Sequence, residues 1–302
     1  MTEATSLISK LRSALPFLPK AAPVVTVIDL VGAIAPSGRA RGISYAKVRP
    51  VIEDAFKPSN LKGVALAINS PGGSPVQSRL IFHAIRRAAE RKKVPVLAFI
   101  EDVGASGGYI LAAAGDEIIA DESSVVGSIG VISATFGFVS AIDRLGVERR
   151  VKTAGDNKSQ LDPFMPEDPD DVARLQEILN DLHEQFIALV KSRRGDALNT
   201  DFDDIFTGAF WTAPRAKERG LVDAMGRLDE YVKTRFGEKI KIKRVTPRTS
   251  PLVRALGGAR GVGAAAADDV ASAARVGPFL DAEGALAALE DRAEWGRFGL
   301  TR

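Results

Sequence analysis

The stretch Asp102–Tyr109, with the sequence DVGASGGY, decides the fold of this 302-residue chain. It follows an apolar run from Val94 to Ile100 that predicts a buried strand, and it precedes Ile110–Ala114, which predicts a helix. Ser106 therefore stands at a strand-to-helix turn, where free backbone N–H groups favour a developing negative charge. The turn predicts either a nucleophilic serine or a glycine–serine turn that only caps a helix.

Strands and helices alternate on both sides of this turn, which predicts an α/β fold. We expect buried strands over 24–31 and 64–68 and helices over 45–56 and after Ser74. A long amphipathic helix is expected to begin after Asp168, a good N-cap, and to end near Arg193. Apolar and basic residues over 147–151 and 239–245 predict exposed or edge strands.

The chain is predicted to have three regions. Residues 1–22 form an amphipathic N-terminal helix or extension, 23–246 the main domain, and 247–302 a tail rich in alanine and glycine with a short helix near its end. We expect the N-terminal helix to pack on the domain or on a neighbouring subunit. The alternative is a peripheral contact with the surface of the inner membrane.

Composition excludes several classes of function. The chain has 41 basic and 38 acidic residues, an excess too small to indicate nucleic-acid binding. It has no cysteine, which excludes disulfides, thiolate zinc sites and a cysteine nucleophile. We expect no metal or cofactor. No apolar run approaches the roughly 18–20 residues that cross a bilayer, and no signal-peptide pattern is present, so a cytoplasmic location is expected.

Three other segments carry polar groups that could serve a reaction. The loop Asn69–Ser74 contains Gly72–Gly73 and is either a plain connection or one donor of an oxyanion hole. Ser128 lies in a segment that should be buried, so its hydroxyl needs a partner, which is either a backbone carbonyl or a catalytic amine. Lys158 lies in a polar loop, where a lysine is usually solvated.

In their order along the chain, these motifs resemble the S49 family of serine peptidases, the signal peptide peptidase A group. The motifs are Asn69–Gly73, Ala105–Tyr109, Val126–Val131, Lys158–Ser159 with Pro163–Phe164, and Trp211–Thr212 leading to Gly220–Asp223. The resemblance covers about residues 24–236 and implies a ClpP/crotonase-like fold of repeated ββα units, here with a long helix and a helical C-terminal extension. The chain is expected to differ from membrane-bound members by lacking a transmembrane anchor, and from the long forms by having one catalytic unit.

The resemblance also implies a site and a function. Ser106 matches the nucleophile, Lys158 the general base, and Ser128 the hydroxyl that positions the lysine. The backbone N–H groups of Gly73 and Gly107 would form the oxyanion hole. The implied function is serine endopeptidase activity on peptides or unfolded protein segments. The implied assembly is a homo-oligomer, in which the lysine comes from the same chain or from a neighbour.

A lysine base sets a physical requirement. A free lysine has a pKa near ~10.4, so it accepts a proton at neutral pH only when burial lowers that pKa.

Two other functions stay open at this point: a catalytically silent oligomeric scaffold that binds peptides, and a crotonase-type acyl-CoA enzyme.

Overall fold

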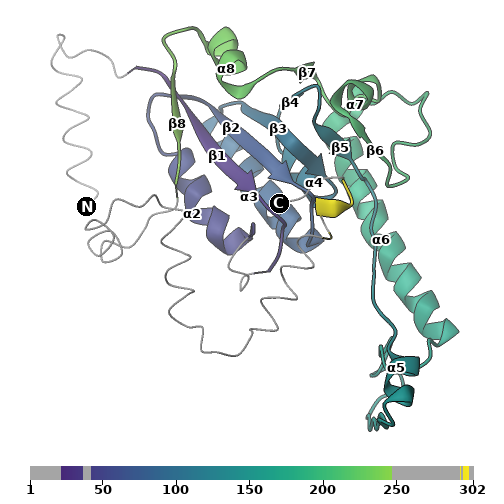
Figure 1. Cartoon of the computed structure of the whole chain (residues 1–302). Helices are drawn as coiled ribbons and strands as arrows, with labels where there is room; N and C mark the ends of the chain where they lie inside the picture. Colours follow the sequence, from purple (N-terminus) through teal and green to yellow (C-terminus); the bar gives the residue numbers. More distant parts are fainter. Residues whose placement is uncertain (1–21, 37–41, 247–292, 294, 299–302) are drawn as a thin grey trace, which may run out of the picture.

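The computed structural model describes residues 22–36, 42–246, 293 and 295–298. An eight-stranded sheet forms its centre, with the order β6-β5-β3-β2-β1-β8, while β4 pairs with β3 and β7 pairs with β4 (Figure 1). The strands are β1 (Val24–Val31), β2 (Leu61–Ser70), β3 (Val96–Ala105), β4 (Glu117–Ala120), β5 (Val125–Gly127), β6 (Phe210–Thr212), β7 (Ala224–Met225) and β8 (Lys241–Arg244).

Helices cover both faces of the sheet. The larger core lies on the face that receives Ile28, Leu66 and Ile68, and four helices pack there: α2 (Tyr45–Ala55), α3 (Pro75–Lys92), α4 (Gly107–Ala112) and α6 (Pro169–Arg194). The opposite face, with Val27 and Phe99, is covered by α8 (Leu228–Phe236). The remaining helices are α5 (Val139–Arg144), α7 (Ala213–Glu218) and a 3-10 turn over Gly195–Ala197.

The central strands β1, β2 and β3 are parallel and almost continuously apolar, as expected for strands that are buried on both faces. β3 changes its neighbour along its length. Leu97–Ile100 pair with β4, whereas Val103–Ala105 pair with β5. The sheet therefore divides along β3, and Ser106 comes directly after the part of β3 that pairs with β5.

The α/β class predicted from the sequence is confirmed by this sheet. The strand over 24–31 has the predicted bounds, and α6 begins after Asp168, whose side chain accepts a hydrogen bond from the Asp170 backbone N–H. The edge strand predicted over 147–151 is wrong: no strand forms there in the described part of the chain. Residues 1–21, and almost all of the predicted tail, lie outside the described residues, so the three-region division stays a prediction.

Candidate active site

Ser106 occupies a sharp turn between β3 and α4. Its backbone has φ +52° and ψ −123°, a conformation that residues other than glycine rarely adopt. The turn is held from both sides. The Ser106 N–H donates to the Gly127 carbonyl over 2.9 Å, and the Ser106 carbonyl accepts from the N–H groups of Tyr109 and Ile110. The same strand–turn–helix geometry raises the nucleophilic serine above the sheet in serine hydrolases.

The glycine loop after β2 lies directly against this turn. A Cβ on Gly72 would lie 2.7 Å from Ser106 Cβ and 2.8 Å from the Gly107 nitrogen, so only a glycine allows the two turns to approach this closely. Gly72 also has φ +108°, a value that disfavours any side chain. The predicted oxyanion loop is therefore in contact with the predicted nucleophile turn.

Two backbone N–H groups are available beside Ser106. The Ile34 N–H donates to the Gly72 carbonyl, and the Ser74 N–H donates to the Ile34 carbonyl, both over 2.7 Å. In this parallel bridge Gly73 lies opposite Ile34, so the N–H of Gly73 itself faces away from Ile34. Gly107 is the first residue of α4, so its N–H has no partner within the helix. Both glycines line the same cavity as Ser106.

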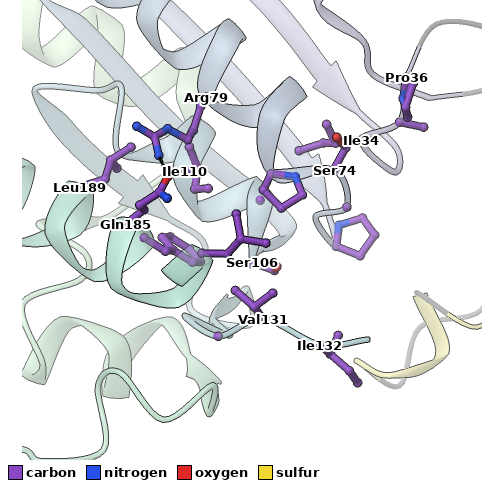
Figure 2. A pocket seen from close by; sticks show the side chains of 18 of the residues that line it. Ile34, Pro36, Ser74, Arg79, Ser106, Ile110, Val131, Ile132, Gln185 and Leu189 are labelled. Carbon is purple, nitrogen blue, oxygen red and sulfur yellow. Dashed lines mark hydrogen bonds between the residues drawn. The ribbon is translucent and has the colours of Figure 1, made fainter. Parts of the chain in front are cut away.

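That cavity has a volume of about 390 Å³ and a mostly apolar lining, and Figure 2 shows Ser106 within it, near Ile110 and Val131. One wall comes from the loop after β1, another from the segment after Ser128, and a third from α6 through Leu182, Gln185, Phe186 and Leu189. Peptide-sized ligands bind in clefts of this kind, where apolar walls surround a few polar groups.

Ser128 follows β5, the strand that pairs with the end of β3. It is 4% exposed, has φ +53°, and donates its backbone N–H to the Ala209 carbonyl over 2.6 Å. Within the described ranges, no hydrogen-bond partner is recorded for its hydroxyl. The backbone carbonyl considered as its partner from the sequence is therefore not found among the described residues. A buried hydroxyl needs a hydrogen-bond partner, so this one can still accept another group.

Lys158 is not brought to Ser106 within one chain. It lies in residues 131–168, which leave the body after β5 and return at α6, and which we call the arm. Lys158 is exposed and does not line the cavity. The arm, with α5, projects beyond the N-terminal end of α6 (Figure 1). That end, at Pro169, is about 24 Å along the helix from Gln185, which lines the cavity.

The two histidines do not offer a replacement base. His183 lies on α6 and contacts the Ile129 carbonyl through Nε2 at 3.0 Å, which ties the segment after Ser128 to the helix. His83 is exposed on α3 and packs edge-on against Phe82. Neither residue is among those that line the cavity.

Two wall residues were not predicted from the sequence. Arg79 and Gln185 lie on different helices and are joined by a hydrogen bond from Arg79 Nη1 to Gln185 Oε1. The apolar stripe of the long helix did indicate the neighbouring wall residues Phe186 and Leu189. Nothing in the local sequence shows which polar residues of a helix face a cavity that a distant loop completes.

A serine at a strand–helix turn, with two backbone donors beside it and an apolar cleft in front, is the geometry of the serine hydrolases that act on acyl groups. Residues 88–241 match the family described as Peptidase family S49. The chain belongs to that family, which confirms the resemblance drawn from the motifs.

Several named proteins are similar to the chain. A protein of Brucella abortus named as the Na(+)/H(+) antiporter NhaA is 44% identical over 278 residues, which are 91% of this chain and 37% of that protein. The chain thus spans little more than a third of this relative. A putative protease of Methanocaldococcus jannaschii is 31% identical, covering 61% of this chain and 58% of its own length. The chloroplastic serine protease SPPA of Arabidopsis thaliana is also 31% identical, covering 62% of this chain and 27% of its own length.

Among solved structures, a mutant of a membrane-bound stomatin-specific protease in complex with a substrate peptide aligns with a TM-score of 0.46 and 16% identity, covering 76% of this chain and 94% of that chain. Within the described ranges, no helix of the present chain has the length and apolar character needed to cross a membrane.

Proposed function

We propose that this chain is a serine endopeptidase that hydrolyses peptide bonds in peptides or unfolded protein segments. The observation that carries the proposal is the Ser106 turn, which lies in an apolar cleft against two glycine N–H groups. Membership of Peptidase family S49 supports it, as do the relatives named as proteases. No observation favours the acyl-CoA alternative.

We propose further that Lys158 of a second copy of the chain completes the site. A lysine base has to be desolvated, and Lys158 is exposed in a single chain. The arm that carries it also exposes large apolar side chains, among them Phe136 and Leu145, which are 79% and 77% exposed. The Phe136 ring also contacts that of Phe138, which stacks on Phe164, and contiguous exposed apolar patches are typical of surfaces that bind a protein, a membrane or a ligand. Docking the arm on a neighbouring copy would bury these groups and the lysine together.

The reaction would proceed in two steps. Ser106 Oγ attacks the scissile carbonyl while Lys158 Nζ takes its proton, and the N–H groups of Gly73 and Gly107 hold the oxyanion. Lys158 then protonates the leaving amine, which breaks the peptide bond and leaves an acyl–Ser106 ester. In the second step Lys158 activates a water molecule that hydrolyses this ester. The Ser128 hydroxyl, which has no recorded partner in the described part of one chain, would orient the lysine amine.

The test compares cleavage of casein and of short apolar peptides by wild type, Ser106→Ala and Lys158→Ala. Both variants should lose activity while assembling like wild type. Lys152→Ala, a change of another exposed lysine on the same arm, should keep it. Activity in Lys158→Ala would contradict its assignment as the base. Peptide binding by wild type without any turnover would support the scaffold alternative instead.

The predicted roles of residues 1–22 and the cytoplasmic location are proposals as well. Co-sedimentation with liposomes of the intact chain and of a chain lacking residues 1–20 separates a membrane-surface anchor from a packing helix. No difference between the two chains would contradict the anchor.

A further inference from the structure

Residues 295–298, near the C-terminus, form an anchor that packs against the end of β3, the strand before the nucleophile. Trp295 and Phe298 are 2% and 8% exposed, and they pack in one apolar cluster with Val103 and Ala105, the last part of β3 before Ser106. The Phe298 ring also meets the Phe210 ring edge-on, with centroids 5.1 Å apart. This segment lies outside residues 88–241, the part of the chain that matches the family.

The anchor brings a cation to the cleft. Arg297 lies between the two buried aromatic residues and lines the same cavity as Ser106. Its backbone is fixed by a hydrogen bond from its N–H to the Ala293 carbonyl over 3.2 Å. The guanidinium carbon lies 5.8 Å from the Phe298 ring centroid, within the roughly 6 Å of a cation–π contact. The side chain is nevertheless exposed, so a ligand in the cleft can reach it.

The charged side chains that line the cleft are all positive among the described residues. Among the described residues that line it, Arg79 and Arg297 are charged, and none is an aspartate or glutamate. Arg79 donates to the neutral Gln185, and no described carboxylate forms an ion pair with either arginine. In Figure 2, Arg79 lies beside Gln185 on one side of Ser106, while the C-terminal turn (yellow) passes on the side of Ile132.

We infer that Arg297 binds a carboxylate of the peptide substrate, so the cleft prefers acidic peptides; this inference rests on the proposed peptidase function. A guanidinium recognises a carboxylate through two parallel N–H···O hydrogen bonds. The carboxylate can be an aspartate or glutamate side chain, or the C-terminal carboxylate of a short peptide. Because Arg297 and Ser106 line one cavity, the same peptide can reach both.

The test measures binding rather than cleavage, with fluorescently labelled apolar peptides and the Ser106→Ala protein. The peptides differ by one glutamate-to-glutamine change at successive positions, and each is made with a free and with an amidated C-terminus. At low salt we expect the glutamate or free-carboxyl peptide to bind about threefold more tightly than its neutral counterpart. High salt should remove the difference.

Arg297→Gln in the same background should remove the preference, and Arg297→Lys should keep part of it. Arg91→Gln removes an exposed arginine elsewhere on the surface and should change nothing. Equal affinity for acidic and neutral peptides would overturn the inference but leave the peptidase proposal standing. A preference that survives Arg297→Gln would overturn the assignment to this arginine. Failure to bind any peptide would contradict both proposals.

Discussion

Ser106 and Ser128 share an unusual backbone conformation. Both have positive φ, and among the described residues other than glycine only Lys93 and Leu161 do the same. Such residues typically cost about 1–3 kcal/mol each, and they persist where the surrounding structure holds them. Here Gly127 connects the two serines, since its carbonyl accepts the Ser106 N–H and Ser128 is the next residue. Two of these four residues with positive φ therefore carry the hydroxyls that the proposed chemistry uses.

At Gly72 we expect an alanine to abolish activity without unfolding the protein. The new methyl group would lie 2.7 Å from Ser106 Cβ and 2.8 Å from the Gly107 nitrogen, so the nucleophile and the oxyanion donor would have to separate. Loss of one such donor typically lowers kcat by about 100- to 1,000-fold. Peptide hydrolysis and circular dichroism of Gly72→Ala measure the two effects.

A matched control is Gly237→Ala. Gly237 also has a positive φ, +93°, but no atom lies within 4 Å of its would-be Cβ. The substitution therefore adds backbone strain without touching the cleft, and it should leave kcat near the wild-type value. Similar losses of activity in both variants would show that strain, rather than the contact at Gly72, is responsible.

At the scale of elements, an ion pair links the buried Arg194 of α6 to Asp223, the residue before β7, whose side chain is 33% exposed. The Arg194 guanidinium, 8% exposed as a residue, forms a two-pronged pair with Asp223, with N···O distances of 2.6 and 3.0 Å, and its Nε donates to the Gly220 carbonyl. Asp223 also accepts the Ile118 N–H of β4 over 2.7 Å. Hydrogen bonding by Asp223 raises the pKa of Arg194 against the opposing effect of burial.

We expect Asp223→Ala to lower the free energy of unfolding by about 3 kcal/mol, because it leaves a buried guanidinium without its partner. The exposed pair Arg49–Glu53 on α2 is the control, and Glu53→Ala should cost less than about 1 kcal/mol. Urea unfolding followed by circular dichroism measures both. Equal small losses would mean that Arg194 finds water or another acceptor when Asp223 is removed.

The arm contains an ion pair, Arg149–Asp162, whose strength depends on pH. The pKa of Asp162 is lowered by a hydrogen bond from the Phe164 backbone N–H and by the Arg149 guanidinium. A carboxyl group with a lowered pKa stabilises the structure above its ordinary pKa, near ~4, and loses this effect as pH falls through the lowered value. The same Arg149 packs over the Phe164 ring, which stacks on Phe138.

Asp162→Asn should therefore loosen the arm at neutral pH, whereas the wild-type arm should loosen only in strong acid. Limited proteolysis between β5 and α6, followed over pH, measures this. Asp156→Asn changes an exposed arm carboxylate and should leave the cleavage rate unchanged. Wild-type protection that is lost at mildly acidic pH, well above 4, would contradict this role for Asp162.

Elements whose signals are local could be predicted from the sequence. The apolar run over 24–31 and the N-cap at Asp168 each depend on residues close together in the chain, and the structure has both. The strand predicted over 147–151 fails because a strand needs a partner strand, and local residue composition cannot supply one. The positions of Arg79 and Arg297 at the cavity were equally hidden, since the fold brings them to one cavity from distant parts of the sequence.

The whole molecule presents half of the proposed dyad in a cleft and the other half on a projecting arm. Ser106 and its glycine donors are held by the body of the α/β fold, while Lys158 is exposed. The arm also exposes Ile132, Phe136 and Leu145, although the Arg149–Asp162 pair gives it a defined internal structure. A monomer of this form should lack peptidase activity. Assembly through the arm would supply the base and bury the apolar surface in one step.

The most direct test of this arrangement mixes two inactive proteins, Ser106→Ala and Lys158→Ala, under conditions in which subunits exchange. The Lys158→Ala subunit still has Ser106, and the Ser106→Ala subunit still has Lys158. Where the two are neighbours in the right order, one intact site forms between them. With equal amounts and random exchange in a closed ring, about a quarter of the sites should recover. We predict peptide hydrolysis near that level. No recovery, once labelled subunits are seen to exchange, would show that the dyad does not form between chains.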